Sequence, residues 1–319
     1  MKKALGILVL ICCCLNGIAQ QSIQVVNPDA VIAYANYPQD WRPDTLSSKR
    51  VKIVGISSAA FYGITMGGLY ATWYSQYSTG KFHTFDDNGE WEGIDKVGHT
   101  LTAYQLSLYG REALWWSGMN NTRSTLYGAG YSMLYQTTIE VMDGFSEGWG
   151  FSWGDMAANT VGSGLYVAQQ LTWKEQRFAL KLSYSPSEYA QYRPNLLGSS
   201  WNERMLKDYN GQTYWLSGNV GSFLPSSSRF PRWINVAFGY GANGMIGGHE
   251  NPTEIDGEPL PYFERYRQFY FSMDVDFTRI PTRSKFLKTV FIALSWVKIP
   301  FPAIEMNTKG EVIFQPLMF

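Results

Sequence analysis

Apolar and polar residues follow a helical pattern through the first half of the chain. A stretch of 28 residues, 53–80, contains no charged side chain. Three further segments have helical character. Those at about 95–116 and 122–142 are followed by glycine or turn residues, and the third, about 152–170, opens with a sequence that resembles a capping box. The pattern predicts a bundle of about four helices.

The uncharged stretch 53–80 is long enough to cross a membrane, which takes about 20 mainly apolar residues. Its Ser, Thr, Tyr and Gly content makes it only mildly hydrophobic, so the alternative is a central helix buried in a soluble bundle. Gly63 and Gly67 lie four residues apart and would let a second helix approach closely. We expect membrane insertion or close membrane association, and therefore a membrane-type bundle.

In the second half of the chain the apolar residues change to a period of two. The clearest run is 268–277, and runs near 178–185 and 234–240 behave in the same way. This alternation predicts half-buried strands. The segment 284–297 returns to helical spacing, and 307–310 has the composition of a hairpin turn.

The two periodicities together predict an α+β protein. A small antiparallel sheet with one or two helices should pack on the helical bundle. The C-terminal Phe319 hints at an outer-membrane barrel. Such barrels need at least eight strands of about ten residues, however, and we count five or six shorter ones, which argues against a full barrel.

The N-terminus has the three parts of a secretory signal. Two lysines precede an apolar run, and small residues before Gln20 supply a cleavage point. All three cysteines lie in this leader, but Ile11 before Cys12 is not the small residue that a lipoprotein signal needs. The mature chain then contains no cysteine, which excludes disulfides, thiolate metal sites and a cysteine nucleophile.

These features divide the chain into four parts. We expect a signal peptide at 1–19, a polar linker containing prolines at 20–45, a helical domain at 46–172 and a strand-rich region at 173–319 packed on it. The protein should be exported, face the periplasm and associate with a membrane, inner or outer.

The amino-acid composition limits the classes of partner that the protein is expected to bind. The chain has 26 basic and 26 acidic side chains, and this balance excludes a general nucleic-acid binder. Aromatic residues reach 16%, equal to the charged fraction. Trp and Tyr favour membrane interfaces, although a soluble protein with aromatic-rich strands has the same composition.

Three successive predicted helices each carry a polar pair near one end. The pairs are Asp95 with His99, Glu140 with Asp143, and Asp155 with Asn159. Spacings of three or four residues place each pair on one helix face. In an antiparallel bundle the starts of the first and third of these helices lie beside the end of the second. We therefore expect one buried polar cluster at that end.

Several members of the cluster have simpler explanations. Asp95 and Asp155 can cap helices, and Ser152 with Asp155 resembles a capping box. Asn159 can hydrogen-bond a neighbouring helix, and His99 can be a core histidine whose hydrogen bonds are satisfied. These interpretations remain open beside the functional one.

Glu140 and Asp143 are harder to explain by local structure. They lie at the C-terminal end of a helix, where the macrodipole disfavours negative charge. Carboxylates gathered in a weakly charged domain need a proton, a cation or a substrate to offset their repulsion. Lys96 and Arg111 are the candidate internal counter-ions.

Three short motifs carry a family resemblance. They are the run 95–99 (DKVGH), the pair 139–140 (IE) and the run 151–162 (FSWGDMAANTVG). In this order they resemble the VanZ-like superfamily, and more closely its relatives described as predicted periplasmic lipoproteins of unknown function. The resemblance covers about 50–170 and implies membrane-associated helices. It maps the family's motif onto Asp95, Lys96, His99, Glu140, Ser152, Asp155 and Asn159.

The residues fit more than one function. In the first hypothesis, an envelope enzyme acts on a membrane lipid or envelope glycan, with His99 as general acid or base oriented by Asp95. The candidate catalytic residues are His99, Asp95, Glu140 and Asp155. The candidate binding residues are Lys96, Asp143, Ser152, Asn159 and Trp149. A divalent metal is the cofactor to consider, with candidate ligands Asp95, His99, Glu140, Asp143 and Asp155.

Two further hypotheses need no catalysis. The aromatic loop 145–153, which contains Trp149, could hold a glycan or acyl chain in a pure binding protein. Alternatively, the polar cluster only stabilises the bundle, and the sheet docks an envelope partner.

Overall fold

The computed structural model describes residues 37–38, 40–225, 227–255 and 257–319. The predicted signal peptide at 1–19 and most of the predicted linker at 20–45 lie outside these residues.

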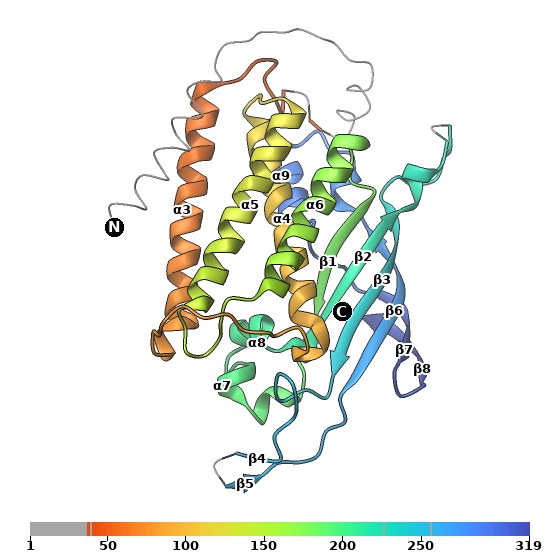
Figure 1. Cartoon of the computed structure of the whole chain (residues 1–319). Coiled ribbons are helices and arrows are strands. Elements are labelled where there is room, and N and C mark those ends of the chain that lie inside the picture. The colour runs from red at the N-terminus through yellow and green to blue at the C-terminus, as the bar shows by residue number, and fades with distance from the viewer. Residues whose placement is uncertain (1–36, 39, 226, 256) are drawn as a thin grey trace.

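Four long helices make up the first part of the described chain, as the hydrophobic pattern predicts. They are α3 (Ser48–Thr72), α4 (Ile94–Trp116), α5 (Asn121–Gly144) and α6 (Trp153–Thr172). Ser47, Asn120 and Ser152 cap α3, α5 and α6, each accepting a hydrogen bond from the backbone N–H three residues later. In Figure 1, α3 stands at one flank of the molecule and the sheet stands at the opposite flank.

Close contacts between α4, α5 and α6 depend on glycine. A Cβ added at Gly128 of α5 would lie 2.4 Å from the backbone nitrogen of Arg111. A Cβ added at Gly162 of α6 would lie 2.1 Å from the backbone oxygen of Thr100. Both positions therefore tolerate no side chain, and the three helices pack backbone against backbone.

The outermost helix, α3, does not use its glycines in this way. A Cβ at Gly63 or Gly67 would meet nothing within 4 Å, so the predicted close helix contact there is wrong. The helix α3 instead contacts α5 through longer side chains. The Tyr131 hydroxyl donates to the backbone oxygen of Ser58, at 3.0 Å. Over Ser48–Ala71, α3 is long and apolar enough to cross a membrane, and only 11% of that apolar window is buried.

The second part is a six-stranded antiparallel sheet with short helices, which confirms the predicted mixture of helix and antiparallel sheet. The strands in sheet order are β1 (Phe178–Tyr184), β2 (Gln212–Asn219), β3 (Ile234–Asn243), β6 (Tyr266–Val275), β7 (Phe301–Asn307) and β8 (Val312–Met318). A separate hairpin joins β4 (Glu254–Ile255) to β5 (Glu258–Pro259). The described helices of this part are α7 (Pro194–Leu197), α8 (Trp201–Lys207) and α9 (Lys285–Ala293).

The helix expected over 284–297 ends earlier, at Ala293. The reason is that the next residues pair with the edge of β1. The N–H of Leu182 donates to the oxygen of Trp296, and the N–H of Lys298 donates to the oxygen of Leu182. Backbone groups used in this bridge cannot continue a helix.

The sheet packs on the bundle through α4. The side-chain amide of Gln105 donates to the backbone oxygen of Leu180 in β1, at 2.8 Å. Leu180 and Leu182 contact the apolar core around Ile94. The first two turns of α4 also carry Asp95 and His99. The contact between α4 and the sheet therefore helps to position the polar cluster.

Candidate functional site

The helix ends that carry the polar pairs meet around His99, which lies one turn into α4. Its Nδ1 is 3.2 Å from Asn159 Oδ1 and 3.6 Å from Glu140 Oε1. Its Nε2 is 3.7 Å from Asp155 Oδ1 and 3.9 Å from Asp95 Oδ1. Residues from three helices therefore surround both nitrogens of one imidazole.

Hydrogen bonds around Asn159 assign a proton to one nitrogen of His99. Gln136 Nε2 donates to Asn159 Oδ1 at 2.8 Å and also faces the backbone oxygen of His99. With Asn159 Oδ1 acting as an acceptor, Nδ1 of His99 carries hydrogen. In the neutral imidazole, Nε2 is then the basic nitrogen, and it faces the carboxylates of Asp95 and Asp155.

Lys96 supplies positive charge inside the cluster. Its ammonium lies 2.8 Å from Asp87 Oδ1, 2.9 Å from Asp95 Oδ2 and 2.8 Å from Asp155 Oδ1. The other expected counter-ion, Arg111, does not take part. It pairs with its neighbour in sequence at the opposite end of α4, so that prediction is wrong. Lys96 bridges three carboxylates because it is on the first turn of α4, one residue after Asp95.

The capping of α6 does not use the carboxylate of Asp155. Ser152 Oγ accepts the backbone N–H of Asp155 and donates to Asp87 Oδ1, at 2.6 Å. The N–H of Ser152 itself donates to Glu140 Oε2, at 3.3 Å. Glu140 thus takes the place that the last residue of a full capping box would have, which leaves the Asp155 carboxylate to Lys96 and His99.

Burial makes the two inner carboxyls hold their protons. It raises the pKa of Glu140 to about 8, and the charges of Asp155 and Asp143 add to this effect. It likewise raises the pKa of Asp155 to about 7, with a contribution from Asp95. Both groups therefore exchange protons near neutral pH.

His99 and Asp95 shift in the directions expected of an ion pair. Burial alone would lower the pKa of His99, but the charges of Asp95, Asp155 and Glu140 outweigh it and raise that pKa. Burial alone would raise the pKa of Asp95, but His99 and Lys96 lower it. The site therefore contains a charged pair next to carboxyls that retain protons.

Asp143 lies at the edge of the cluster rather than at its centre. Its Oδ1 accepts a hydrogen bond from the Tyr74 hydroxyl, at 2.8 Å, and burial raises its pKa to about 6. Trp149 lies on the same side. Its ring packs edge-on against Tyr74 and Tyr77, with centroids 5.9 and 4.4 Å away. Asp143 and Trp149 therefore belong to the wall of the site and contact the segment that follows α3.

Two residues of the cluster were not expected from the sequence. Asp87 precedes α4 and contacts Lys96, while Tyr209 comes from the strand-rich half and donates to Asp95 Oδ1 at 2.9 Å. Neither belongs to a periodic pair, and only the tertiary fold brings them near His99. A run of polar and aromatic residues at 207–215 was the one local signal for Tyr209.

A cavity of about 300 Å³ adjoins the cluster. Its polar wall includes Asp95, His99 and Asp155. Its apolar and aromatic wall is formed by Leu69, Trp73, Phe85, Trp149 and Leu206. Leu69 belongs to the last turn of α3, and Trp73 follows directly. The cavity thus joins the buried titratable groups to the end of the helix that is long enough to cross a membrane.

Three of the candidate metal ligands are close enough to share an ion. One atom each from Asp95, His99 and Asp155 lie within 4.8 Å of one another, and an imidazole with two carboxylates suits a divalent cation. The same Asp155 oxygen, however, lies 2.8 Å from Lys96 Nζ. An ion at this position would have to displace the ammonium group.

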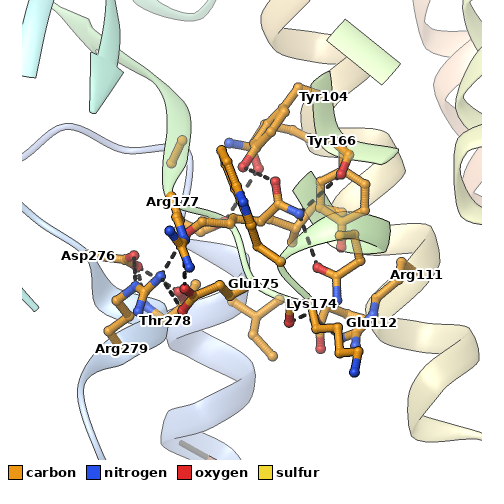
Figure 2. A pocket seen from close by; sticks show the side chains of 18 of the residues that line it. Tyr104, Arg111, Glu112, Tyr166, Lys174, Glu175, Arg177, Asp276, Thr278 and Arg279 are labelled. Atoms are coloured by element: carbon orange, nitrogen blue, oxygen red, sulfur yellow. Dashed lines mark hydrogen bonds and ion pairs between the residues drawn. The ribbon is translucent and has the colours of Figure 1, made fainter. Parts of the chain in front are cut away.

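A second cavity, of about 440 Å³, lies at the other end of α4, between the bundle and the sheet. Figure 2 shows its charged side chains pointing toward one another, with Glu175 between Arg177 and Arg279. The hydroxyl of Tyr104 donates to the side chain of Gln176 in the same wall. The charged and polar side chains of this cavity are paired with one another. We therefore interpret the cavity as a polar contact region between the helical bundle and the sheet.

Comparison with known proteins concerns the helical part. Residues 83–170 match a family described as predicted periplasmic lipoprotein (DUF2279). The matched segment contains the cluster residues from Asp87 to Asn159 but leaves out Tyr209, α3 and the sheet. The wider resemblance to VanZ-like proteins stays a prediction. Searches among curated proteins and among solved structures gave no match. The family description agrees with an exported envelope protein that faces the periplasm and whose activity is unknown.

Proposed function

We propose that this chain is a membrane-associated envelope protein that acts on the polar head of a lipid or lipid-linked glycan, with the His99 cluster as its acid–base group. The observation that carries the proposal is the position of the 300 Å³ cavity. It has titratable groups on one wall and the end of α3 on another. An amphipathic molecule lying along α3 in a membrane would place its polar head beside His99.

The geometry supports proton transfer at Nε2 of His99. His99 lines the cavity, and in its neutral form, in equilibrium with the imidazolium, Nε2 can accept a proton from a water molecule or a hydroxyl group as that group attacks the substrate. Asp155, whose pKa near 7 keeps it partly protonated, lies 3.7 Å from the same nitrogen. It can donate its proton to the departing oxygen, so the proton that enters at His99 is balanced by the one that leaves Asp155.

The other members of the cluster hold this pair in place. Asn159 binds Nδ1 of His99 and so keeps Nε2 directed at the cavity. Lys96 holds Asp95 and Asp155 at ion-pair distance. Tyr209 donates to Asp95 and closes the side that faces the sheet.

A metal-assisted version of the same function is favoured by one observation. Ligand atoms of Asp95, His99 and Asp155 lie within 4.8 Å of one another. A divalent ion bound there would polarise a phosphoryl or carbonyl oxygen of the substrate. Lys96 contacts Asp95 and Asp155, so a bound ion would have to displace its ammonium group. Whether the ammonium group is displaced therefore distinguishes the metal-assisted version from the metal-free one.

Genetic complementation tests the proposal. A strain lacking the gene is supplied with wild type, His99→Gln or His249→Gln, and lipids and lipid-linked glycans are compared by mass spectrometry. His249 is exposed and belongs neither to the cluster nor to the lining of the cavity, so it is the matched control. We expect His99→Gln to lose complementation at normal protein abundance, while His249→Gln retains it. Full complementation by His99→Gln would overturn the proposal.

A further inference from the structure

At β1 one face of the sheet packs on the bundle through Leu180; beyond β1 the same face, here called the outer face, carries a continuous row of exposed apolar side chains. The strand register makes these residues direct neighbours across five strands: Leu216, Phe238, Phe271, Ile304 and Phe314. Each exposes between 41% and 65% of its surface. A contiguous apolar patch of this kind is rare on a protein surrounded by water.

A second row beside the first has the same character. Phe269, Met306 and Val312 are direct neighbours in β6, β7 and β8, and Met273 extends the patch along β6. All four are exposed. None of the residues in the two rows is charged, so the patch offers nothing that would favour water.

The opposite face of the same strands is buried and holds paired polar groups beside Trp215 and Tyr270. Lys181 pairs with Asp274 at 2.7 Å, and the Ser217 hydroxyl donates to the same carboxylate. Gln268 donates to Glu305 at 2.8 Å. These side chains are almost completely inaccessible. The predicted alternation is therefore present, but the polar set faces inward and the apolar set faces outward.

This polarity is the reverse of the arrangement that water favours. In water, burial of charged and hydroxyl groups beneath an exposed apolar surface carries costs on both faces. In lipid the outward side chains are solvated by hydrocarbon, and the paired polar groups are sheltered inside. Strands that face lipid alternate in this way, apolar outward and polar inward.

The length of the strands and the charge at one end of the patch fit a bilayer. The strands β3 and β6 have ten residues each, or roughly 33 Å, close to the thickness of a hydrocarbon core at about 30 Å. Charge bounds one end of the patch. Arg267, where β6 begins, pairs with Glu92, and in the adjacent turn between β7 and β8 Lys309 pairs with Glu264.

A second exposed apolar surface in the described part of the chain favours lipid over a protein partner. It lies on α3, where Ile56 and Ile64 are more than 70% exposed. In Figure 1, α3 and the sheet form opposite flanks of the molecule. One partner surface can cover one flank, whereas a bilayer that surrounds the molecule reaches both.

We propose that the outer face of the sheet, the two rows from Leu216 to Phe314 and from Phe269 to Val312, contacts the hydrocarbon of the membrane. The proposal deepens the membrane association in the proposed function and is independent of the chemistry at His99. It makes the chain an integral membrane protein held by its sheet as well as by α3.

Site-directed spin labelling tests this proposal, because a chain without its leader contains no cysteine. Single cysteines replace Phe271 on the sheet face or Tyr262, which is 89% exposed in the loop before β6. The labelled variants are reconstituted into vesicles of phosphatidylethanolamine and phosphatidylglycerol. Collision of each label with oxygen, which is lipid-soluble, is compared with collision with a water-soluble nickel chelate.

We expect the ratio of oxygen to nickel collisions to be several-fold higher at Phe271→Cys than at Tyr262→Cys. The comparison is repeated with Phe314→Cys in place of Phe271→Cys, to check that the result does not come from a folding defect caused by one substitution. Equal ratios would show that the face lies in water. Low collision with both reagents at Phe271→Cys would show a protein partner such as a second copy. Either result overturns the lipid-facing sheet and leaves the complementation test of His99 unaffected.

Discussion

Lys96 Nζ lies 2.8 Å from Asp155 Oδ1, so the positive charge that the cluster needs comes from the residue that follows Asp95 in sequence. The same ammonium contacts Asp87 and Asp95. Three carboxylates around one lysine resemble the environment of a bound cation, with the ammonium in the place of the ion. This relationship decides how the site should respond to metals.

We predict that Lys96→Met increases the affinity for a divalent cation. Removal of the ammonium leaves the carboxylates of Asp87, Asp95 and Asp155 without their common partner, and Mn²⁺ can replace it. Isothermal titration with Mn²⁺ measures the effect. Lys207→Met, a lysine in α8 outside this ion-pair group, is the control and should bind as wild type does. Equal affinity in Lys96→Met and wild type would contradict the competition between lysine and metal.

The stability of the protein should depend on pH through Glu140. Its folded pKa, about 8, is above the ordinary value of 4.5, so the folded state holds this proton more tightly than the unfolded state. The contribution to stability is complete below pH 4.5 and is lost as the pH rises through 8. Glu140→Gln cannot lose this proton, so its melting temperature should rise relative to wild type between pH 5 and pH 9.

Differential scanning fluorimetry in detergent at several pH values measures this difference. Glu258→Gln, at an exposed position in β5, should follow wild type at every pH. A gap between Glu140→Gln and wild type that stays constant with pH would show that Glu140 does not hold a proton in the folded protein.

The packing of α4 against α6 should fail if Gly162 gains a side chain. A Cβ there would lie 2.1 Å from the backbone oxygen of Thr100, and backbone cannot move away as a side chain can. We expect Gly162→Ala to lose about 1–3 kcal/mol of unfolding free energy, the usual cost of overpacking. Gly164→Ala in the same helix meets nothing within 4 Å and should not lose stability. Equal stability of the two variants in denaturant titration would refute the close contact.

Substitution of Trp149 and of His99 distinguishes a catalytic site from a site that only binds its ligand. Trp149 forms part of the cavity wall, and its ring packs on Tyr74 and Tyr77. In an acid–base site, Trp149→Ala should weaken function by lowering substrate affinity, whereas His99→Gln should abolish turnover and leave lipid binding intact. Loss of binding in His99→Gln, with normal turnover in Trp149→Ala, would reverse these roles.

Local spacing was enough to predict the helical part of the site. Pairs three or four residues apart on one helix face need only the helix to bring them together, as Asp95 and His99 show. Tyr209 could not be predicted, because its contact with Asp95 spans 114 residues and depends on how the second half folds back. The same holds for Asp87, which reaches Lys96 from a segment without regular periodicity.

The sheet shows a different limit of sequence patterns. A period of two in 268–277 predicts a strand, but it is identical whether Phe271 or Ser272 faces inward. The choice depends on the solvent, which periodicity does not contain. The bridge between Leu182 and Val297 shortened the expected helix for a similar reason, since a strand edge far away in sequence competed for its backbone.

Turnover of native lipids by purified protein tests the central claim most directly. Wild type and His99→Gln, purified in detergent, are each incubated with a total lipid extract of the envelope, and all lipid classes are compared by mass spectrometry. The account predicts that wild type converts one class of lipid or lipid-linked glycan and that His99→Gln converts none. Conversion at the same rate by both proteins, or by neither, would contradict it.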